Sequence, residues 1–245
     1  MMDKKVALVT GGSRGIGAAI VKALAQRGFR VAVNCLSNVE MAERVLGESG
    51  GDGAVFPADV RDAKALTAMV RAVEKQLGPV EAAVHNANIS FPMGPFWQLP
   101  WEGVSAKLLG ELGAFHALAA AVVPGMVERK WGRIVAVSSS LSRFASEGFG
   151  AHAAAKSALD GACRVLSRET GPHGITVNVV APGLVETDAT SRQPAEQKQF
   201  VAMLTPLKRN GQPQDIGPVV AFLCSDEARW ITGQYIPLNG GINTV

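Results

Sequence analysis

The chain has 245 residues, of which 47% are hydrophobic and 18% charged, and its formal net charge is +3. This length predicts one large domain with a sizeable core, and the apolar fraction excludes intrinsic disorder. The small basic excess is scattered along the chain, which argues against a nucleic-acid binder. The densest basic group, Arg129, Lys130 and Arg133 around Trp131, is interpreted as a solvated helix end. Only one residue is a tyrosine, Tyr235.

The three cysteines, Cys35, Cys163 and Cys224, lie far apart in apolar stretches and form no CxxC pair. They are interpreted as buried core residues of a protein from a reducing compartment. The N-terminal segment has no long apolar stretch of the kind found in signal peptides. The longest apolar run, residues 114–127, is too short to cross a bilayer. We therefore expect a cytoplasmic protein that binds no membrane.

Short β-branched segments alternate with longer helical ones. Strands are predicted at residues 6–10, 31–34, 54–57, 81–85, 133–138, 176–181 and 235–238. Helices are predicted at residues 16–26, 39–48, 63–77, 108–129, 151–170 and 215–225. Apolar strands separated by helices indicate βαβ units around a buried parallel sheet, either a doubly wound sheet or a TIM barrel. Without a linker or an internal repeat, residues 1–245 are predicted to form a single domain.

The first predicted strand runs into a glycine-rich turn and then an Ala-rich helix. Glycines at 11, 15 and 17 let the backbone turn tightly and approach a pyrophosphate, which would bind the free N–H groups of the helix start. This arrangement favours an open Rossmann-type sheet over a barrel, and a dinucleotide site over a turn without a ligand. The residues assigned to the cofactor here are Gly11, Ser13, Arg14, Gly15, Ile16 and Gly17.

The end of the second predicted strand bears on the choice of dinucleotide. An NAD site usually has an Asp or Glu there for the ribose 2′-hydroxyl, whereas this chain has Asn34-Cys35-Leu36. Arg14 can meet a 2′-phosphate instead, so NADP(H) is favoured over NAD(H). Asp59 is placed to hydrogen-bond the adenine, and a simple loop cap explains the same residue nearly as well.

The spacing TGxxxGxG at residues 10–17 resembles the short-chain dehydrogenase/reductase family, and the resemblance extends along the whole chain. Residues 84–88 (VHNAN) resemble the family's NNAG segment, and residues 132–140 resemble the segment with its catalytic Ser. Residues 178–187 are similar to the segment that closes over the nicotinamide, and residues 231–241 to the C-terminal strand region. Within the family, the chain most resembles the β-ketoacyl-carrier-protein reductases and similar ketoreductases.

The resemblance implies a seven-stranded, mostly parallel Rossmann-type sheet, doubly wound, with helices on both faces. It also implies further contacts with the dinucleotide. The residues concerned are Asn34, Asp59, Val60, Asn86, Ala87, Asn88, Lys156, Pro182, Gly183, Val185 and Thr187.

The resemblance implies a catalytic Ser, Tyr and Lys with a supporting Asn, and two of these four are changed here. Ser139 and Lys156 match, but the family's Tyr-x-x-x-Lys begins with His152, and counting back places Glu111 at the Asn position. Because positions i and i+4 share a helix face, His152 and Lys156 still converge on one cleft. Tyr235 lies in the last predicted strand and is not expected to replace the missing Tyr. The last Gly of NNAG is Asn88, which adds a side chain near the cofactor.

The changed set makes the reaction the open question. A Lys156 cation beside His152 disfavours the imidazolium form and leaves a neutral base. If the Glu111 carboxylate faces the same cleft, it opposes that effect, and His152 can act as acid and base near neutral pH. The alternative is that Glu111 only pairs with Lys156 and that catalysis has been lost.

Four other features carry weaker expectations. His85 is either a strand-end residue near the cofactor or a core hydrogen-bond partner, and no catalytic metal is expected. The aromatic-rich residues 88–101 line a substrate cleft, pack in the core or contact another subunit. Residues 187–200 are polar and follow a predicted cofactor contact, which suggests a mobile lid.

Three functions are compatible with the sequence. The first is an NADPH-dependent reductase of a carbonyl on an organic substrate that is free or bound to a carrier protein or CoA. In it Ser139 orients the carbonyl, His152 donates the proton, Lys156 holds the ribose and Glu111 tunes the pair. The second is a non-redox enzyme, such as a dehydratase, cyclase or isomerase, and the third is a catalytically silent dinucleotide-binding subunit. The resemblance implies a homo-oligomer, a tetramer or a dimer.

Overall fold

The computed structural model describes residues 4–191 and 193–243. In this part of the chain, seven strands form one sheet in the order β3-β2-β1-β4-β5-β6-β7, and every neighbouring pair is parallel. The order reverses between β1 and β4, which confirms the predicted doubly wound Rossmann-type sheet. The strands are β1 (Val6–Val9), β2 (Arg30–Cys35), β3 (Gly53–Pro57), β4 (Val80–His85), β5 (Gly132–Val137), β6 (Ile175–Pro182) and β7 (Tyr235–Leu238).

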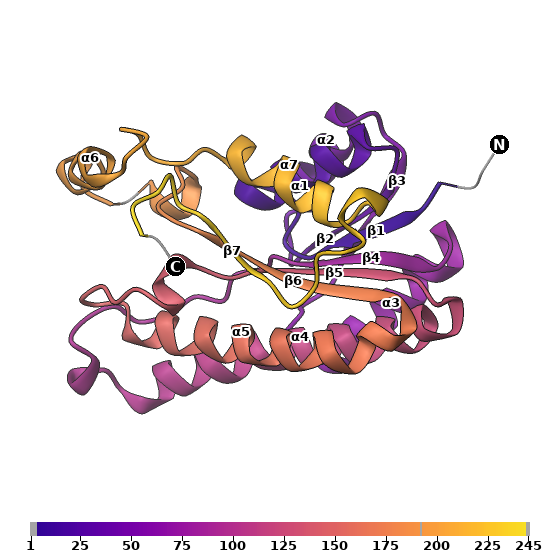
Figure 1. Ribbon diagram of the computed structural model, residues 1–245, viewed down its shortest axis with the longest axis horizontal. Coiled ribbons are helices and arrows are strands. Elements are labelled where there is room, and N and C mark those ends of the chain that lie inside the picture. Colours follow the sequence, from indigo (N-terminus) through magenta and orange to yellow (C-terminus); the bar gives the residue numbers. More distant parts are fainter. Residues whose placement is uncertain (1–3, 192, 244–245) are drawn as a thin grey trace.

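Helices cover both faces of the sheet (Figure 1). One face carries α1, α2 and α7, the other carries α3, α4 and α5, and α6 lies beyond one end of the sheet. The helices are α1 (Gly15–Gln26), α2 (Val39–Glu48), α3 (Ala63–Leu77), α4 (Trp101–Arg129), α5 (Gly150–Thr170), α6 (Ala195–Leu204) and α7 (Pro213–Leu223).

The strands read as continuous apolar runs because both faces of the sheet are buried. Successive side chains of a strand point to opposite faces. In β1, Ala7 and Val9 enter the core under α1 and α7, while Val6 and Leu8 enter the core under α3, α4 and α5. The sheet therefore separates two apolar cores and places its strand ends at a common edge.

Two helices differ from the sequence prediction. Helix α4 begins at Trp101, whereas its predicted start is residue 108. The predicted start is late because Lys107 and Glu111, which are buried, interrupt the apolar pattern in the first half of the helix. Helix α6 was not predicted, and none of its residues is buried. A helix that buries no face has no apolar stripe by which its sequence can be identified.

Helix α4 is, by length and hydropathy alone, able to cross a membrane, and it is the one such helix in the described part of the chain. In the structure it packs against α3, α5 and the sheet. It buries Lys107 and Glu111 together with apolar residues such as Phe115 and Leu118. These buried apolar residues belong to the core beneath the sheet, whereas Leu109 of the same helix is exposed.

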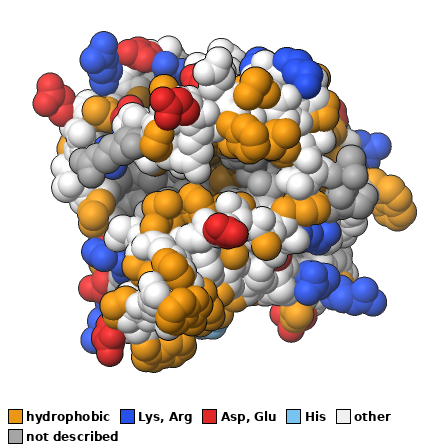
Figure 2. Space-filling view, turned by 90° about the vertical axis from the view of Figure 1, so that its left-hand side faces the viewer, with side chains coloured by type: hydrophobic (Ala, Val, Ile, Leu, Met, Phe, Trp, Pro, Cys, Tyr) orange, Lys and Arg blue, Asp and Glu red, His pale blue; other side chains and the backbone are white. Residues whose placement is uncertain are grey.

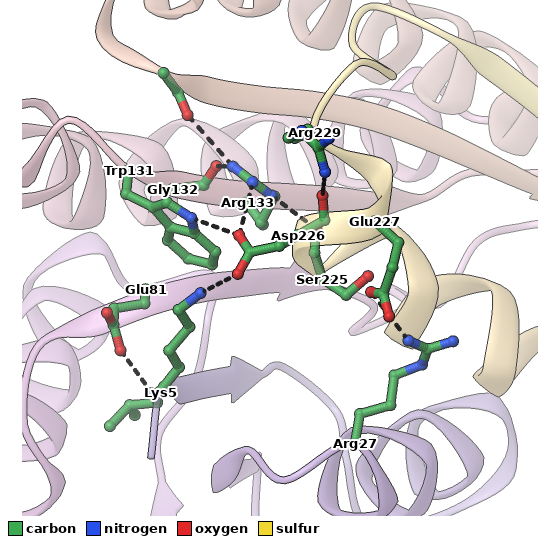
Figure 3. A network of polar contacts seen from close by, with 12 residues as sticks. Lys5, Arg27, Glu81, Trp131, Gly132, Arg133, Ser225, Asp226, Glu227 and Arg229 are labelled. Carbon is green, nitrogen blue, oxygen red and sulfur yellow. Dashed lines mark hydrogen bonds and ion pairs between the residues drawn. The ribbon is translucent and has the colours of Figure 1, made fainter. Parts of the chain in front are cut away.

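A polar network joins the amino-terminal edge of the sheet to the segment after α7 (Figure 3). Arg133 is buried, lies 4.3 Å over the Trp131 ring and donates to the Ser225 carbonyl over 3.1 Å. The Trp131 indole N–H and the Lys5 ammonium both bind the Asp226 carboxylate, at 2.9 and 2.8 Å. The interpretation of Arg133 as part of a solvated helix end is therefore wrong, because its cation is held between a ring, a carbonyl and a carboxylate.

Candidate active site

A cleft of about 2110 Å³ opens at the carboxyl ends of the strands, where the strand order reverses. Figure 2 looks onto this end of the molecule, where hydrophobic side chains gather above and below a central hollow. Ligand pockets for drug-sized molecules hold about 300–1,000 Å³, so this cleft has room for a dinucleotide and a substrate together. Every residue that the sequence assigns to the cofactor lines it, and so do Ser139 and His152.

The glycine-rich turn has the backbone that its sequence predicts. Gly11 and Gly15 adopt φ angles of +65° and +54°, which residues with a Cβ rarely adopt. A Cβ on Gly17 would collide with the Gly11 carbonyl oxygen. The first turn of α1 consequently reaches the cleft, and its free N–H groups and positive dipole end suit a pyrophosphate.

Hydrogen bonds lock this turn to the end of β4. The Thr10 hydroxyl accepts from the backbone N–H groups of Asn86 and Ala87, at 3.0 and 3.1 Å. The Asn86 side-chain amide donates to the carbonyls of Thr10 and Gly11, both at 3.0 Å. Asn86 therefore lines the cleft as predicted, but its amide N–H groups serve the turn. Thr10, which the sequence indicated only as part of the TGxxxGxG motif, thus holds the end of β4 against the turn.

Asn34 also supports the turn. Its side chain is buried; Oδ1 accepts from the Gly11 N–H over 3.3 Å, and Nδ2 donates to the Phe56 and Ala58 carbonyls at 3.1 Å each. The residue predicted to contact the cofactor thus has both side-chain ends engaged within the protein. Its side chain therefore holds the backbone of Gly11 in place.

Asp59 and Arg61, which follow β3, form a salt bridge in the cleft lining. The Asp59 carboxylate binds the Arg61 guanidinium at 2.6 Å and accepts from the Arg61 backbone N–H at 2.9 Å, and the Arg61 side chain holds the pKa of Asp59 below its usual range. This geometry favours the loop-cap interpretation of Asp59. Arg61, which the sequence analysis missed, lines the cleft together with Arg14. Because Arg61 is paired with Asp59, Arg14 is the candidate for a 2′-phosphate.

Ser139 caps the start of the short helix Ser140–Ser142, which follows β5. Its hydroxyl oxygen accepts from the Leu141 N–H over 3.2 Å, and this leaves the hydroxyl proton to donate into the cleft. Behind it, the hydroxyl of Tyr235 donates to the Ser139 carbonyl over 3.3 Å. Tyr235 lies outside the cleft lining, so it supports the Ser139 segment from behind and does not replace the missing Tyr.

His152 lies in the first turn of α5 and stacks on Phe91, with 4.6 Å between ring centroids and 30° between planes. Its Nδ1 is buried and has no hydrogen-bond partner among the described residues. Burial, reinforced by the Lys156 and Lys107 cations, lowers the pKa of His152 to about 3. The imidazole is therefore neutral at pH 7, as expected from the neighbouring Lys156 cation. It does not titrate near neutral pH, which the role of His152 as both acid and base would require.

The reason lies in the placement of Glu111. Its carboxylate is fully buried beneath the cleft and does not line it. Oε1 accepts from the Lys156 ammonium over 2.6 Å, and Oε2 accepts from the Lys107 ammonium over 2.6 Å. Burial alone would raise the pKa of Glu111, but Lys156, His85 and Lys107 outweigh it and hold that pKa well below its usual range. The condition that Glu111 faces the cleft is not met, because its carboxylate lies beneath the cleft and binds Lys156 there.

Lys156 connects this buried cluster to the cleft. Its ammonium group also donates to the Val137 carbonyl over 2.8 Å, while the residue lines the cleft. His85 approaches Glu111 with Nε2 at 3.3 Å from Oε1, and burial lowers the pKa of His85. A neutral His85 with Nε2 as donor fits this contact. His85 is thus the core hydrogen-bond partner of the two alternatives.

Lys107 is the main site residue that the sequence analysis missed. It is fully buried, and burial lowers its pKa to about 8. Lys107 and Glu111 stand four residues apart on α4, a spacing at which side chains of opposite charge meet on one helix face. The pattern was visible in the sequence, but the predicted helix began one residue too late to include it.

The aromatic segment before α4 has two parts. Phe91 and Met93 line the cleft, whereas Trp97 is 82% exposed and Trp101 is 66% exposed. The core-packing interpretation is therefore wrong for both tryptophans. The segment after β6 also borders the cleft, through Thr187, Gln193, Val201 and other residues. Its mobility stays a prediction. In the described residues, no three His, Cys, Asp or Glu side chains come together as metal ligands.

A glycine-rich turn at the switch point of a parallel sheet, with Ser139, His152 and Lys156 in the same cleft, defines a Rossmann-type dinucleotide-binding protein. A family model described as Enoyl-(Acyl carrier protein) reductase matches residues 11–243. The chain is 37% identical to Nodulation protein G of Azospirillum brasilense, with 99% of both chains covered. It is 38% and 35% identical to the 3-oxoacyl-(acyl-carrier-protein) reductases FabG of Staphylococcus aureus and Escherichia coli, again over 99% of each chain. The chain belongs to the short-chain dehydrogenase/reductase family.

Proposed function

We propose that this protein is an NADP(H)-dependent oxidoreductase that reduces a carbonyl group of an organic substrate, carried as a thioester on a carrier protein or on CoA. The names of two of its relatives, 3-oxoacyl-(acyl-carrier-protein) reductases, support the substrate class. The observation that carries the proposal is the shared cleft, which is lined by the glycine-rich turn and by Ser139, His152 and Lys156.

The residues present fit a dinucleotide. Gly17 leaves the space that a Cβ would fill, and the start of α1 offers free N–H groups to a pyrophosphate. Arg14 lines the cleft and supports a 2′-phosphate as the ligand, and residues 34–36 at the end of β2 include no acidic side chain for a 2′-hydroxyl. When bound, the reduced nicotinamide supplies the hydride for the carbonyl carbon.

The side chains of the chain supply orientation and the proton. The Ser139 hydroxyl, whose proton is free, donates a hydrogen bond to the substrate oxygen and so orients the carbonyl group. His152 stands where the family has its Tyr, and it gives the proton to that oxygen. Lys156, fixed by Glu111 and the Val137 carbonyl, presents its ammonium group to the ribose.

A direct assay tests this function. Fluorescence titration measures the binding of NADPH and NADH, and failure to bind either would refute the proposal. NADPH oxidation is then followed with ketones and β-ketoacyl thioesters for the wild type, His152→Ala and His152→Tyr. We expect turnover by the wild type and its loss in His152→Ala. Full activity in His152→Ala would show that His152 is not the proton donor.

A second candidate function is favoured by the neutral state of His152. A stacked imidazole whose pKa lies near 3 is a ready base at pH 7 and a scarce acid. It therefore suits proton abstraction in a dehydration or isomerisation in which the cofactor is structural or absent. This candidate gains if thioester substrates change without NADPH oxidation. A silent wild type that becomes a reductase only as His152→Tyr would instead favour a dinucleotide-binding subunit.

We further propose a cytoplasmic homo-oligomer, a tetramer or a dimer. Exposed aromatic residues outside the cleft support it: Trp230 is 97% exposed and Trp97 is 82% exposed. Light scattering coupled to size exclusion tests this, and a monomer at micromolar concentration would contradict it.

A further inference from the structure

Two positions at which this chain differs from its family are joined by one buried side chain. Lys107 donates to Oε2 of Glu111 over 2.6 Å and to Oδ1 of Asn88 over 2.9 Å. It also donates to the Ile89 carbonyl over 3.0 Å. An ammonium group has three N–H donors, and here three oxygens receive them.

These contacts reach the cleft by two routes. Through Glu111, Lys107 fixes the carboxylate that holds Lys156. Through Asn88 and Ile89, it fixes the segment that carries Phe91, and its ammonium also lies 5.4 Å from the centroid of the Phe91 ring. Phe91 is the ring on which His152 stacks.

The charges explain why a lysine is placed there at all. Burying an ammonium group carries a large desolvation cost, and an apolar residue of similar volume often gives equal or greater stability. The Glu111 carboxylate already has one cation partner in Lys156. We therefore attribute the second cation, Lys107, to the positioning of the groups that it contacts and not to the stability of the core.

We propose that Lys107 is a positioning residue that sets the geometry of both Lys156 and His152. It does so by tying Glu111 on α4 to the Asn88–Ile89 segment after β4. The role in turnover rests on the proposed function, but the positioning itself does not.

The test uses the full-length protein with labelled histidine side chains. The ring current of Phe91 shifts the carbon-bound proton resonances of His152, which the spectrum of His152→Ala assigns. Phe91→Leu gives the positions of these resonances without stacking. We compare Lys107→Met, which keeps the aliphatic stem and removes the ammonium group, with Lys22→Met, a matched control that removes an exposed ion pair to Glu48 on the opposite side of the sheet.

We expect the His152 resonances of Lys107→Met to move toward their positions in Phe91→Leu, and those of Lys22→Met to stay in place. In an active enzyme, kcat of Lys107→Met should fall by about tenfold or more, because Lys156 and His152 are displaced from the geometry of the reaction. NADPH affinity should change little, because the phosphate-binding turn is untouched.

If Lys107→Met does not fold, Lys107→Met combined with Glu111→Gln removes the ammonium group and the carboxylate charge together and leaves an uncharged oxygen at position 111 for Lys156, and the same resonances decide. His152 resonances that keep their wild-type positions in the folded variant would overturn the proposal. Unchanged kcat in an active enzyme would overturn its catalytic part. A protein without turnover refutes the proposed function alone, since the resonances still report on Lys107.

Discussion

The ammonium nitrogen of Lys156 lies 2.6 Å from Oε1 of Glu111, and the carboxylate is shielded completely from solvent. A buried ion pair of this kind holds its members in one geometry, and removing one member leaves the other charge uncompensated. The lysine that faces the cleft is therefore held from below by the protein itself. This relation connects the stability of the fold to the geometry of the site.

Replacing Glu111 by Gln should destabilise the protein strongly. The change leaves the Lys107 and Lys156 cations close together without their shared carboxylate, and breaking such a buried pair costs about 3–5 kcal/mol. Urea unfolding of both proteins at pH 7 measures the difference. Adding Lys107→Met should restore part of the loss, because one of the two cations is then gone. If Glu111→Gln alone is as stable as the wild type, the carboxylate makes no net contribution to the free energy of unfolding.

The rate of carbonyl reduction should fall as pH rises. The pKa of His152 is lowered to about 3, so above that pH the protonated fraction drops about tenfold per pH unit. We expect kcat/KM for reduction to decrease from pH 5.5 to 8, and the reverse oxidation of the alcohol, which needs the neutral base, to stay level. His152→Tyr serves as the control, because a tyrosine stays protonated over this range. A flat profile for reduction in the wild type would exclude His152 as its acid.

His152 should also make the protein sensitive to acid. In the unfolded chain the imidazole binds a proton below its ordinary pKa of about 6.5, whereas in the folded protein it does so only near pH 3. The unfolded state thus gains the proton first, and the free energy of unfolding falls by at most about 1.4 kcal/mol per pH unit between these values. His152→Phe keeps the stacking ring and removes the proton site. Its urea midpoint should fall less steeply from pH 6.5 to 4 than that of the wild type, and equal slopes would contradict this account.

Arg14 should distinguish the two dinucleotides. It lines the cleft at the start of α1, where a 2′-phosphate offers a bidentate partner that a 2′-hydroxyl lacks. Arg14→Ala should weaken NADPH binding by about tenfold and leave NADH binding within about twofold. Fluorescence titration with both cofactors measures this. Equal losses for the two would place Arg14 on the pyrophosphate instead.

The sequence predicted the fold well, and it predicted the cleft lining better than the roles of the residues in it. The spacing of the glycines and the alternation of apolar strands with helices are local patterns, and such patterns can be recognised in the sequence alone. Whether Glu111 faces a cleft or lies beneath it depends on how α4 packs on β4 and α5. That placement depends on contacts between residues far apart in the chain.

Asn34 and Lys107 also show that the sequence does not reveal which partners a side chain finds in the fold. Asn34 lines the cleft, but its side-chain amide is hydrogen-bonded to Gly11, Phe56 and Ala58 within the protein. Lys107 was overlooked because a lysine next to an apolar run indicates a solvated position, and only Glu111, Asn88 and Ile89 together make its burial possible. A buried charge is recognised from its partners, and the partners come from different elements.

The hydroxyl of Tyr235 that supports the Ser139 carbonyl gives this protein a reporter of its own. Because the chain has one tyrosine, biosynthetic incorporation of fluorotyrosine places a single fluorine probe in the whole molecule. That probe stands directly behind the serine segment, outside the space that a ligand occupies. Movements of the segment during binding can therefore be followed by one resonance, without a label in the cleft and without assigning any other signal.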